Sequence, residues 1–255
     1  MPLVRRGRLR KRWRYVGVYG PEVMLCAARA RIGPFSQSFW VVWDREREQR
    51  FAHTRTPAGG EVAVDGSEVR IAAADLKATL HLGDAAPVEA VCPSGVRGYG
   101  WTRKRAPVPV SGTIEAPGRR WQLESHAIDD ESAGYHQRHT SWRWSAGIGG
   151  AADGRAVAWN LVSGINDPER ASERAIWVDG VPSEPAPVDF DGLGAVCFRG
   201  GARLDFEAES ERARDDNLIL LRSRYLHRFG TFSGSLDGIE LAHGFGVMEE
   251  HDAAW

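Results

Sequence analysis

The sequence predicts an all-β fold of antiparallel strands with little helix. No long segment carries a sustained i, i+3, i+4 apolar pattern, whereas stretches such as residues 77–82 (KATLHL) alternate between apolar and polar side chains. Turn-forming pairs such as Asp65-Gly66 separate short strand-like runs at intervals of about 8–12 residues, which is typical of sandwiches and barrels. The 29 glycines and 10 tryptophans suit many tight turns around an aromatic-rich interior or pocket.

The strands of the first half follow from local composition. Residues 14–19 and 23–32 form two strands around a Gly20-Pro21 turn, and residues 38–44 (SFWVVWD) are rich in the β-branched and aromatic types that strands favour. Asp65-Gly66 lies between alternating apolar runs and predicts a type I′ hairpin. Further strands are expected at residues 50–56, 77–82 and 88–92. Residues 93–109 are rich in glycine, proline and arginine, and they suggest a boundary between an N-terminal β half, residues 1–110, and a C-terminal β half, residues 111–255.

The second half continues in the same way. A hairpin is expected around Pro117-Gly118, and residues 129–134 (DDESAG) suggest an acidic loop. A strand at residues 139–146 is followed by a glycine-rich turn at residues 147–154 and a returning strand at residues 155–162. The remaining predicted strands cover residues 175–178, 188–190, 194–199, 203–208, 218–225, 229–235 and 239–248.

Length, charge and cysteine content limit the protein class. A chain of 255 residues can bury one large all-β domain or two smaller ones, and its net charge of −1 gives no global field that favours nucleic acid. The three cysteines, Cys26, Cys92 and Cys197, are far apart and form no CxxC pair, so we expect a reducing compartment and no disulfide framework. No apolar run approaches the roughly 18 residues of a membrane span. We therefore expect a cytoplasmic protein without an integral membrane span.

A basic arm opens the chain. Residues 5–14 carry seven cationic side chains, and the less polar run that follows is broken by Pro21 and Glu22, which argues against a signal peptide. A solvated tail is the favoured interpretation of such a charge run. Attraction to anionic lipid or nucleic acid is the alternative.

Residues 135–180 concentrate the candidate functional side chains, including four of the ten tryptophans. Strand alternation places Trp142 and Trp144 on one face, together with Arg138, which could anchor an anionic end of a ligand. This face either packs in a core or forms the apolar wall of a ligand pocket. His136 and His139 fall on opposite faces, so at most one of them points into a given pocket.

Asn160 and Glu173 are polar residues in strand-like or turn-like surroundings. Each has a structural explanation, because Asn can cap a loop and Glu can pair with a nearby base. If Glu173 is instead buried beside the tryptophans, its pKa rises and it becomes a general acid or base.

Two weaker motifs favour structural explanations. Residues 147–152 (GIGGAA) fit the loose dinucleotide pattern, but a second strand follows where a helix N-terminus is needed, which favours a hairpin loop. Glu249 and His251 share a strand face and could bind a metal, but a solvated C-terminal tail is the preferred interpretation. We expect neither a metal nor a cofactor.

The chain also resembles a family of uncharacterised bacterial proteins, a domain of unknown function that is distantly related to the lipocalin-like carotenoid hydratase and tocopherol cyclase group. The residues that carry this resemblance extend over most of the chain and are Lys104, Gly112, Asp130, Gly134, Trp142, Trp144, Asn160, Leu161, Gly164, Asp167, Ser172, Glu173, Ala175, Ile176, Trp177, Asp179, Gly180, Phe229, Gly230, Phe232, Gly234, Glu250, His251 and Trp255. The resemblance implies a calycin or lipocalin-like barrel, or two consecutive curved β-sheet halves. Where the family typically has Thr-Glu-Asn-Ala, this chain has Arg174 at the third position, so a role that needs a neutral amide there does not carry over.

The more distant relatives act on long apolar isoprenoids by protonation, hydration or cyclisation, although the family itself implies no particular reaction. Our first hypothesis is binding of a hydrophobic, isoprenoid-like or lipid-like molecule, with acid-assisted hydration, isomerisation or cyclisation if the protein is an enzyme of lyase or isomerase type. Its candidate catalytic residues are Glu173 as the acid, Asn160 as an orienting amide, and His136. Its candidate binding residues are Trp142, Trp144, Trp177, Arg138 and Lys104. Two alternatives stay open: a lipid-binding or pigment-binding protein without chemistry, and a structural module whose tryptophans all lie in a core.

Overall fold

The computed structural model describes residues 1–218 and 221–254, and every regular element among them is a β-strand. The all-β prediction is therefore confirmed. Ile219 and Leu220 of one predicted strand, and Trp255 of the family resemblance, lie outside the described residues. Within the described part of the chain, no helix is long and apolar enough to cross a membrane.

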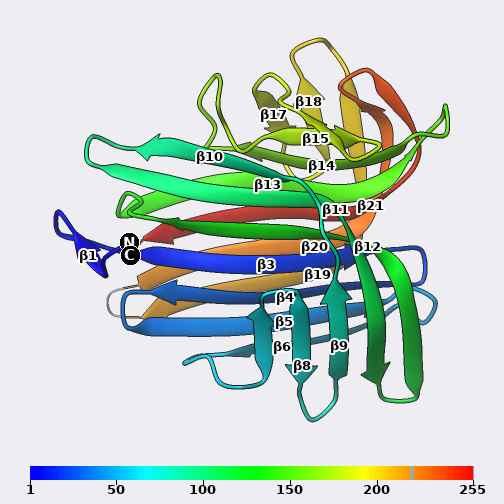
Figure 1. Ribbon diagram of the computed structural model, residues 1–255, viewed down its shortest axis with the longest axis horizontal. Coiled ribbons are helices and arrows are strands. Elements are labelled where there is room, and N and C mark those ends of the chain that lie inside the picture. Colours follow the sequence, from blue (N-terminus) through cyan, green and yellow to red (C-terminus); the bar gives the residue numbers. More distant parts are fainter. Residues whose placement is uncertain (219–220, 255) are drawn as a thin grey trace.

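Two large antiparallel sheets build the molecule (Figure 1). The first has ten strands in the order β6-β5-β4-β3-β12-β11-β9-β8-β7, with β10 beside β11. Its strands are β3 (Lys11–Tyr19), β4 (Val23–Ile32), β5 (Phe35–Asp44), β6 (Gln49–Arg55), β7 (Val62–Asp65), β8 (Glu68–Ala72), β9 (Lys77–Leu82), β10 (Pro87–Ser94), β11 (Gly98–Ala116) and β12 (Arg119–Gly134). A separate short hairpin of β1 (Val4–Arg5) and β2 (Arg8–Leu9) precedes it.

The second sheet has nine strands in the order β16-β15-β14-β13-β21-β20-β19-β18-β17. Its strands are β13 (His139–Ala151), β14 (Ala156–Ser163), β15 (Ala175–Val178), β16 (Val181–Ser183), β17 (Val188–Asp191), β18 (Ala195–Phe198), β19 (Arg203–Leu218), β20 (Leu221–Leu236) and β21 (Ile239–Ala254).

Both sheets share one connectivity. In each, four strands extend to one edge, the chain crosses to the opposite edge, and the last strand returns to pair with the first. This arrangement confirms the prediction of two consecutive curved halves. The chain passes from the first sheet to the second between Gly134 and His139, whereas the expected limit at residues 110/111 falls inside β11. The division of the chain into two folding units stays a prediction.

Strand alternation divides the side chains among three cores. In β3, Val16 and Val18 face a core enclosed by the first sheet. Strands β8 and β9 cross in front of the long strands of this sheet (Figure 1). Tyr15 and Tyr19 face the opposite way and join a core shared with Trp144 and other residues of the second sheet. A third core lies within the second sheet. The two curved sheets therefore pack against each other through their outer faces, and this contact is called the interface below.

The predicted acidic loop at residues 129–134 is wrong, because these residues end the central strand β12. Its carboxylates are neutralised by cations on the neighbouring strands. Asp129 pairs with Arg14 at 2.9 Å and Arg105 at 2.5 Å, and Glu131 is bound in the same way by arginines of β3 and β11.

The glycine-rich turn at residues 147–154 is partly wrong, because β13 continues to Ala151. Glycine is needed inside this strand for close packing. A Cβ on Gly147 would lie 2.2 Å from the Trp159 ring, and one on Gly149 would lie 2.2 Å from the carbonyl oxygen of His243. The turn itself lies at residues 152–155.

Within the described residues, neither terminal segment is a solvated tail. Residues 239–254 form β21, which lies between β13 and β20 in the middle of the second sheet. At the N-terminus, Arg8 donates to the Ser94 carbonyl at 2.9 Å, and the buried Lys11 donates to the Gln137 carbonyl at 3.0 Å. The basic arm is thus attached to the body of the protein.

Candidate functional site

A cluster of one amine and two carboxyl groups is buried at the interface. The Nζ atom of Lys104 in β11 lies 2.5 Å from Oδ1 of Asp130 in β12 and 3.4 Å from Oε2 of Glu173, which precedes β15. All three side chains are buried. Lys104 and Asp130 are register partners, so sheet pairing alone places them side by side, while Glu173 reaches them from the second half of the chain.

Two amides hold Glu173 in this position. Asn160 in β14 donates from Nδ2 to the Glu173 carbonyl at 2.9 Å and accepts at Oδ1 from the Trp144 indole at 2.8 Å. Asn166 donates to Oε2 of Glu173 at 3.0 Å. Asn160 therefore fixes the backbone of the acid and the adjacent ring, while Asn166 fixes the carboxyl group.

The loop that carries Glu173 is fixed from behind by Arg174. This arginine is fully buried, and its Nη2 donates to the Pro168 carbonyl at 2.8 Å. Glu184 adds a second anchor by accepting from both the backbone nitrogen and the hydroxyl of Ser172, at 2.8 and 2.7 Å. The residue that departs from the family pattern thus has a structural role here, next to the acid and pointing away from it.

Burial determines the protonation of the cluster. Desolvation raises the pKa of Glu173, and the charge of Asp130 adds to the rise while that of Lys104 opposes it. Desolvation is also the main cause that raises the pKa of Asp130. Burial alone would lower the pKa of Lys104, but the two carboxylates outweigh it and raise that pKa. The cluster thus places one cation beside two acids whose ionisation burial opposes.

A second buried acid, Glu249 in β21, faces the same interface. Trp142 donates to its Oε1 at 2.9 Å, and the hydroxyl of Tyr225 donates to its Oε2 at 2.8 Å. Desolvation raises the pKa of Glu249 to about 7 despite these two donors, and the charge of Asp130 also raises it. Glu249 can therefore exchange a proton near neutral pH.

Several buried polar atoms of this region have no hydrogen-bond partner among the described residues. They include both ring nitrogens of His136, the hydroxyls of Ser132 and Thr140, and the indole nitrogen of Trp177. Burial, followed by the charges of Lys11 and Arg8, lowers the pKa of His136 to about 4. Because buried polar groups are nearly always paired, these unpartnered atoms are unusual.

His136 reaches the site only because of a glycine. A Cβ on Gly100 would lie 2.6 Å from Oδ1 of Asn166 and 2.7 Å from Cε1 of His136. The two side chains therefore pack against the backbone of Gly100, and Asn166 links this point to Glu173.

The residues predicted from sequence are distributed as follows. Lys104, Asn160, Glu173 and Trp144 are brought together, Trp142 and Trp177 line the shared core, and His136 lies at its edge. Arg138 is exposed and lies outside the strand, away from this group. Whether these residues act on a ligand stays a prediction.

Sequence reasoning missed Asp130, Asn166, Tyr225 and the burial of Glu249 as parts of the site. The alternation that placed Glu249 and His251 on one strand face was a usable signal. Asn166 offered none, because it lies in an irregular loop.

A pocket of about 280 Å³ opens beside the cluster. Its walls come from the end of β10, the start of β13 with Gln137 before it, and the loop after β14. Asn166 lines this pocket and also donates to the Glu173 carboxyl. The Trp142 and Glu173 side chains are not part of its lining.

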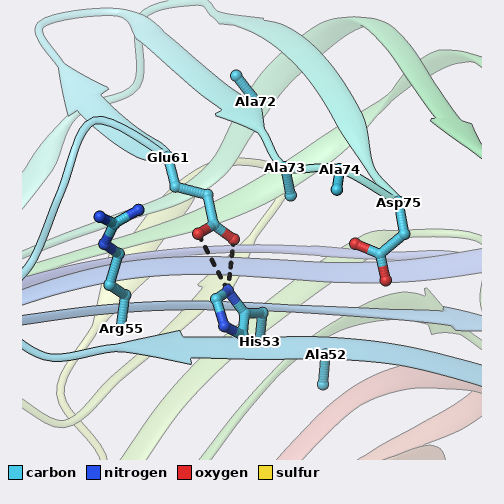
Figure 2. Close-up of a pocket in the computed structure, with 8 residues that line it drawn as sticks. All are labelled: Ala52, His53, Arg55, Glu61, Ala72, Ala73, Ala74 and Asp75. Atoms are coloured by element: carbon cyan, nitrogen blue, oxygen red, sulfur yellow. Dashed lines mark hydrogen bonds and ion pairs between the residues drawn. The ribbon is translucent and has the colours of Figure 1, made fainter.

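A larger hollow of about 670 Å³ lies on the first sheet, where Arg55 and Asp75 flank the His53–Glu61 pair (Figure 2). Burial raises the pKa of Glu61, but hydrogen bonds from Trp40 and His53 outweigh it and lower that pKa. Glu61 is thus an ionised, fully paired group. The interface is the better candidate site, because it combines acids of raised pKa with an aromatic wall.

The fold and this interface define a class, an all-β protein of two curved, lipocalin-like halves with acids buried between them. The chain belongs to the DUF2804 family, a domain of unknown function, whose model matches residues 61–255. The resemblance noted from the sequence is thereby confirmed.

Solved structures share the architecture. An AttH candidate from Nitrosomonas europaea is 14% identical with a TM-score of 0.61, covering 94% of this chain and 92% of that one. Kievitone hydratase from Nectria haematococca is 10% identical with a TM-score of 0.61, covering 94% and 88%. CghA is 10% identical with a TM-score of 0.52, covering 96% and 88%. At such identities the likeness establishes the fold alone. No match was found among curated protein sequences.

Proposed function

We propose that this protein binds a hydrophobic small molecule between its two sheets and catalyses an acid-assisted hydration, isomerisation or cyclisation, with Glu173 as the proton donor. The observation that carries the proposal is the buried group of one amine, Lys104, with two carboxyls, Asp130 and Glu173. The ammonium balances one carboxylate. The second carboxyl is neutral because an unpaired buried charge is too costly.

A neutral carboxylic acid in an apolar site is what protonation of an alkene or enol requires near neutral pH. The Glu173 proton forms a C–H bond with the π electron pair and leaves a carbocation beside a carboxylate. Water can capture the cation and return a proton to Glu173, which completes a hydration. Loss of a neighbouring proton to the carboxylate completes an isomerisation, and capture by an internal alkene followed by proton loss completes a cyclisation.

The aromatic wall suits a cationic intermediate. Trp144 and Trp177 belong to the apolar core around the cluster, and the ring of Tyr15 meets Trp144 edge-on at 5.3 Å. Indole faces attract a cation by their quadrupole, and the attraction is stronger where water is excluded. Asn160 contributes as a positioning residue, since it holds the backbone of Glu173 and the Trp144 ring together.

The substrate class is inferred from the side chains buried at the interface. The buried side chains of the interface are mostly apolar and include a few unpartnered polar atoms, such as those of His136 and Trp177, and side chains of this kind suit a largely hydrophobic molecule with one or two polar groups. The name of one structural neighbour, kievitone hydratase, supports a hydration among the three reactions.

The test compares Glu173→Gln with the control Glu250→Gln. The Glu250 carboxylate is half-exposed and pairs with Arg143. Native mass spectrometry of freshly purified protein identifies retained ligand, and turnover of isoprenoid alkenes in D2O reports deuterium in the product. We expect the wild type and Glu250→Gln to convert substrate and Glu173→Gln to lose at least about 100-fold in rate while still binding it.

Retention of a ligand by all three proteins without conversion would instead support the non-enzymatic binding protein. Equal turnover by Glu173→Gln and the wild type would exclude Glu173 as the acid.

A further inference from the structure

The exposed apolar side chains gather at one end of the molecule. Among the described residues, eight large apolar side chains are exposed, and six of them lie on or directly before three hairpins. These six are Val4 and Leu9 on the β1–β2 hairpin, Met1 and Leu3 directly before it, Phe35 at the β4–β5 hairpin and Val96 at the tip of the β10–β11 hairpin. Val96 is 98% exposed and Phe35 59% exposed, so most of each side chain faces solvent. Such a concentration of apolar surface indicates a contact with something outside the chain.

The three hairpins are neighbours. Gly33, in the β4–β5 turn, donates to the Arg10 carbonyl at 3.0 Å, and a Cβ on Gly33 would lie 3.0 Å from the Leu9 side chain. Arg8 donates to the carbonyl of Ser94 at the base of the β10–β11 hairpin at 2.9 Å. Figure 1 shows β1 and the turn between β10 and β11 at the same end of the molecule. This group of three hairpins is called the hairpin end.

The hairpin end is also strongly basic. Residues 1–34 contain nine lysine and arginine residues and one acidic residue, Glu22, although the whole chain has a net charge of −1. Within the part of the chain that the structure describes, Arg6, Arg29 and Arg97 have no carboxylate partner and are exposed. The positive charge at this end is therefore available to an anionic partner.

We propose that the hairpin end docks on the surface of an anionic phospholipid bilayer. Apolar side chains at hairpin tips can enter the boundary between headgroups and acyl chains, while arginines around them contact the phosphates. This combination distinguishes a bilayer from a nucleic acid, because aliphatic tips such as Val96 and Leu9 provide neither stacking nor base-edge hydrogen bonds. A second copy of this chain is disfavoured, because a two-fold contact would bring the same cationic groups together.

The docking end also carries the pocket beside the acid cluster. Ser94 and Gln137 line that pocket, and a Cβ on Gly95 in the β10–β11 turn would lie 3.0 Å from the Gln137 side chain. A hydrophobic molecule dissolved in the bilayer would thus meet the pocket without crossing water. The docking rests on surface residues alone and does not depend on acid catalysis by Glu173.

The experiment is flotation of the full-length protein with vesicles of phosphatidylcholine alone, or with added phosphatidylglycerol. Val96→Asp and Phe35→Asp test the apolar tips, and Arg29→Gln and Arg97→Gln test the charges. Val181→Asp is the matched control, because Val181 is also an exposed valine but lies on β16 of the second sheet. All five sites are exposed, so the variants retain the fold, and their thermal unfolding confirms it.

We expect wild-type binding to vesicles that contain phosphatidylglycerol, with about a tenfold fall in partitioning for each aspartate variant at a tip and about a fivefold fall for each arginine variant. Val181→Asp should bind like the wild type, and salt should weaken the binding of both. Binding that Val96→Asp and Phe35→Asp leave unchanged would overturn the proposal, as would tighter binding of the wild type to a single-stranded oligonucleotide than to the vesicles.

Discussion

Replacing Glu249 by glutamine should remove a pH dependence from the stability of the fold. In the folded protein, burial raises the pKa of this carboxyl from 4.5 to about 7, whereas in the unfolded chain it titrates normally. Between these values the folded state holds a proton that the unfolded state has released. Its contribution is therefore fully present below about pH 4.5 and is lost as the pH rises through about 7, and a shift of this size corresponds to about 3 kcal/mol.

The assay is urea unfolding of the wild type and Glu249→Gln at intervals from pH 4.5 to pH 8. The amide cannot titrate but can still accept from Trp142, so the variant should gain about 3 kcal/mol relative to the wild type across this range. Groups that do not interact with Glu249 titrate alike in both proteins and cancel in the difference. Glu250→Gln, half-exposed on the same strand, should follow the wild type. Parallel profiles for the wild type and Glu249→Gln would refute the reasoning.

Two further substitutions test the cluster and its packing. Lys104→Met leaves Asp130 and Glu173 buried without a cation, and it should lower the free energy of unfolding in urea by about 3–5 kcal/mol at pH 7. The loss should be smaller at low pH, where both acids are protonated. Lys77→Met, at an exposed lysine, is the control, and a loss below about 1 kcal/mol for Lys104→Met would contradict the ion-pair geometry. Gly100→Ala places a Cβ against Asn166 and His136 and should lower the free energy of unfolding by about 1–3 kcal/mol. Gly60→Ala should be neutral, because no atom lies within 4 Å of the added Cβ. Equal melting temperatures for the two variants would count against the packing described for His136.

Local alternation was enough to place many strands. Residues 77–82 and 175–178 were predicted as strands and form β9 and β15 with the same limits. The acidic run at residues 129–134 was misassigned because the arginines that neutralise it lie on β3 and β11. A strand was predicted at residues 239–248, but its continuation to Ala254 was missed because its pairing partners, β13 and β20, precede it in the chain and composition alone does not reveal them. Long-range charge pairing thus overrode local polarity.

The candidate site was predictable only in part, for a similar reason. Alternation placed Trp142 and Trp144 on one face, but β3, β4 and β14 have apolar side chains on both faces, so the pattern could not reveal which core that face enters. The structure places the Trp142 and Trp144 face between the two sheets instead of inside one barrel. Asp130 and Glu173 meet only because the two halves pack together, and no local spacing encodes that contact.

The central claim is that the cluster of Lys104, Asp130 and Glu173 stores one proton between the sheets at neutral pH. Infrared spectroscopy of the protonated carboxyl band at pH 7 tests it directly, in a Glu249→Gln background so that Glu249 does not contribute. We predict a band that disappears when either Glu173→Gln or Asp130→Asn is added, because each change leaves one carboxylate balanced by Lys104. No band in the background protein, or a band that survives both substitutions, would contradict the account.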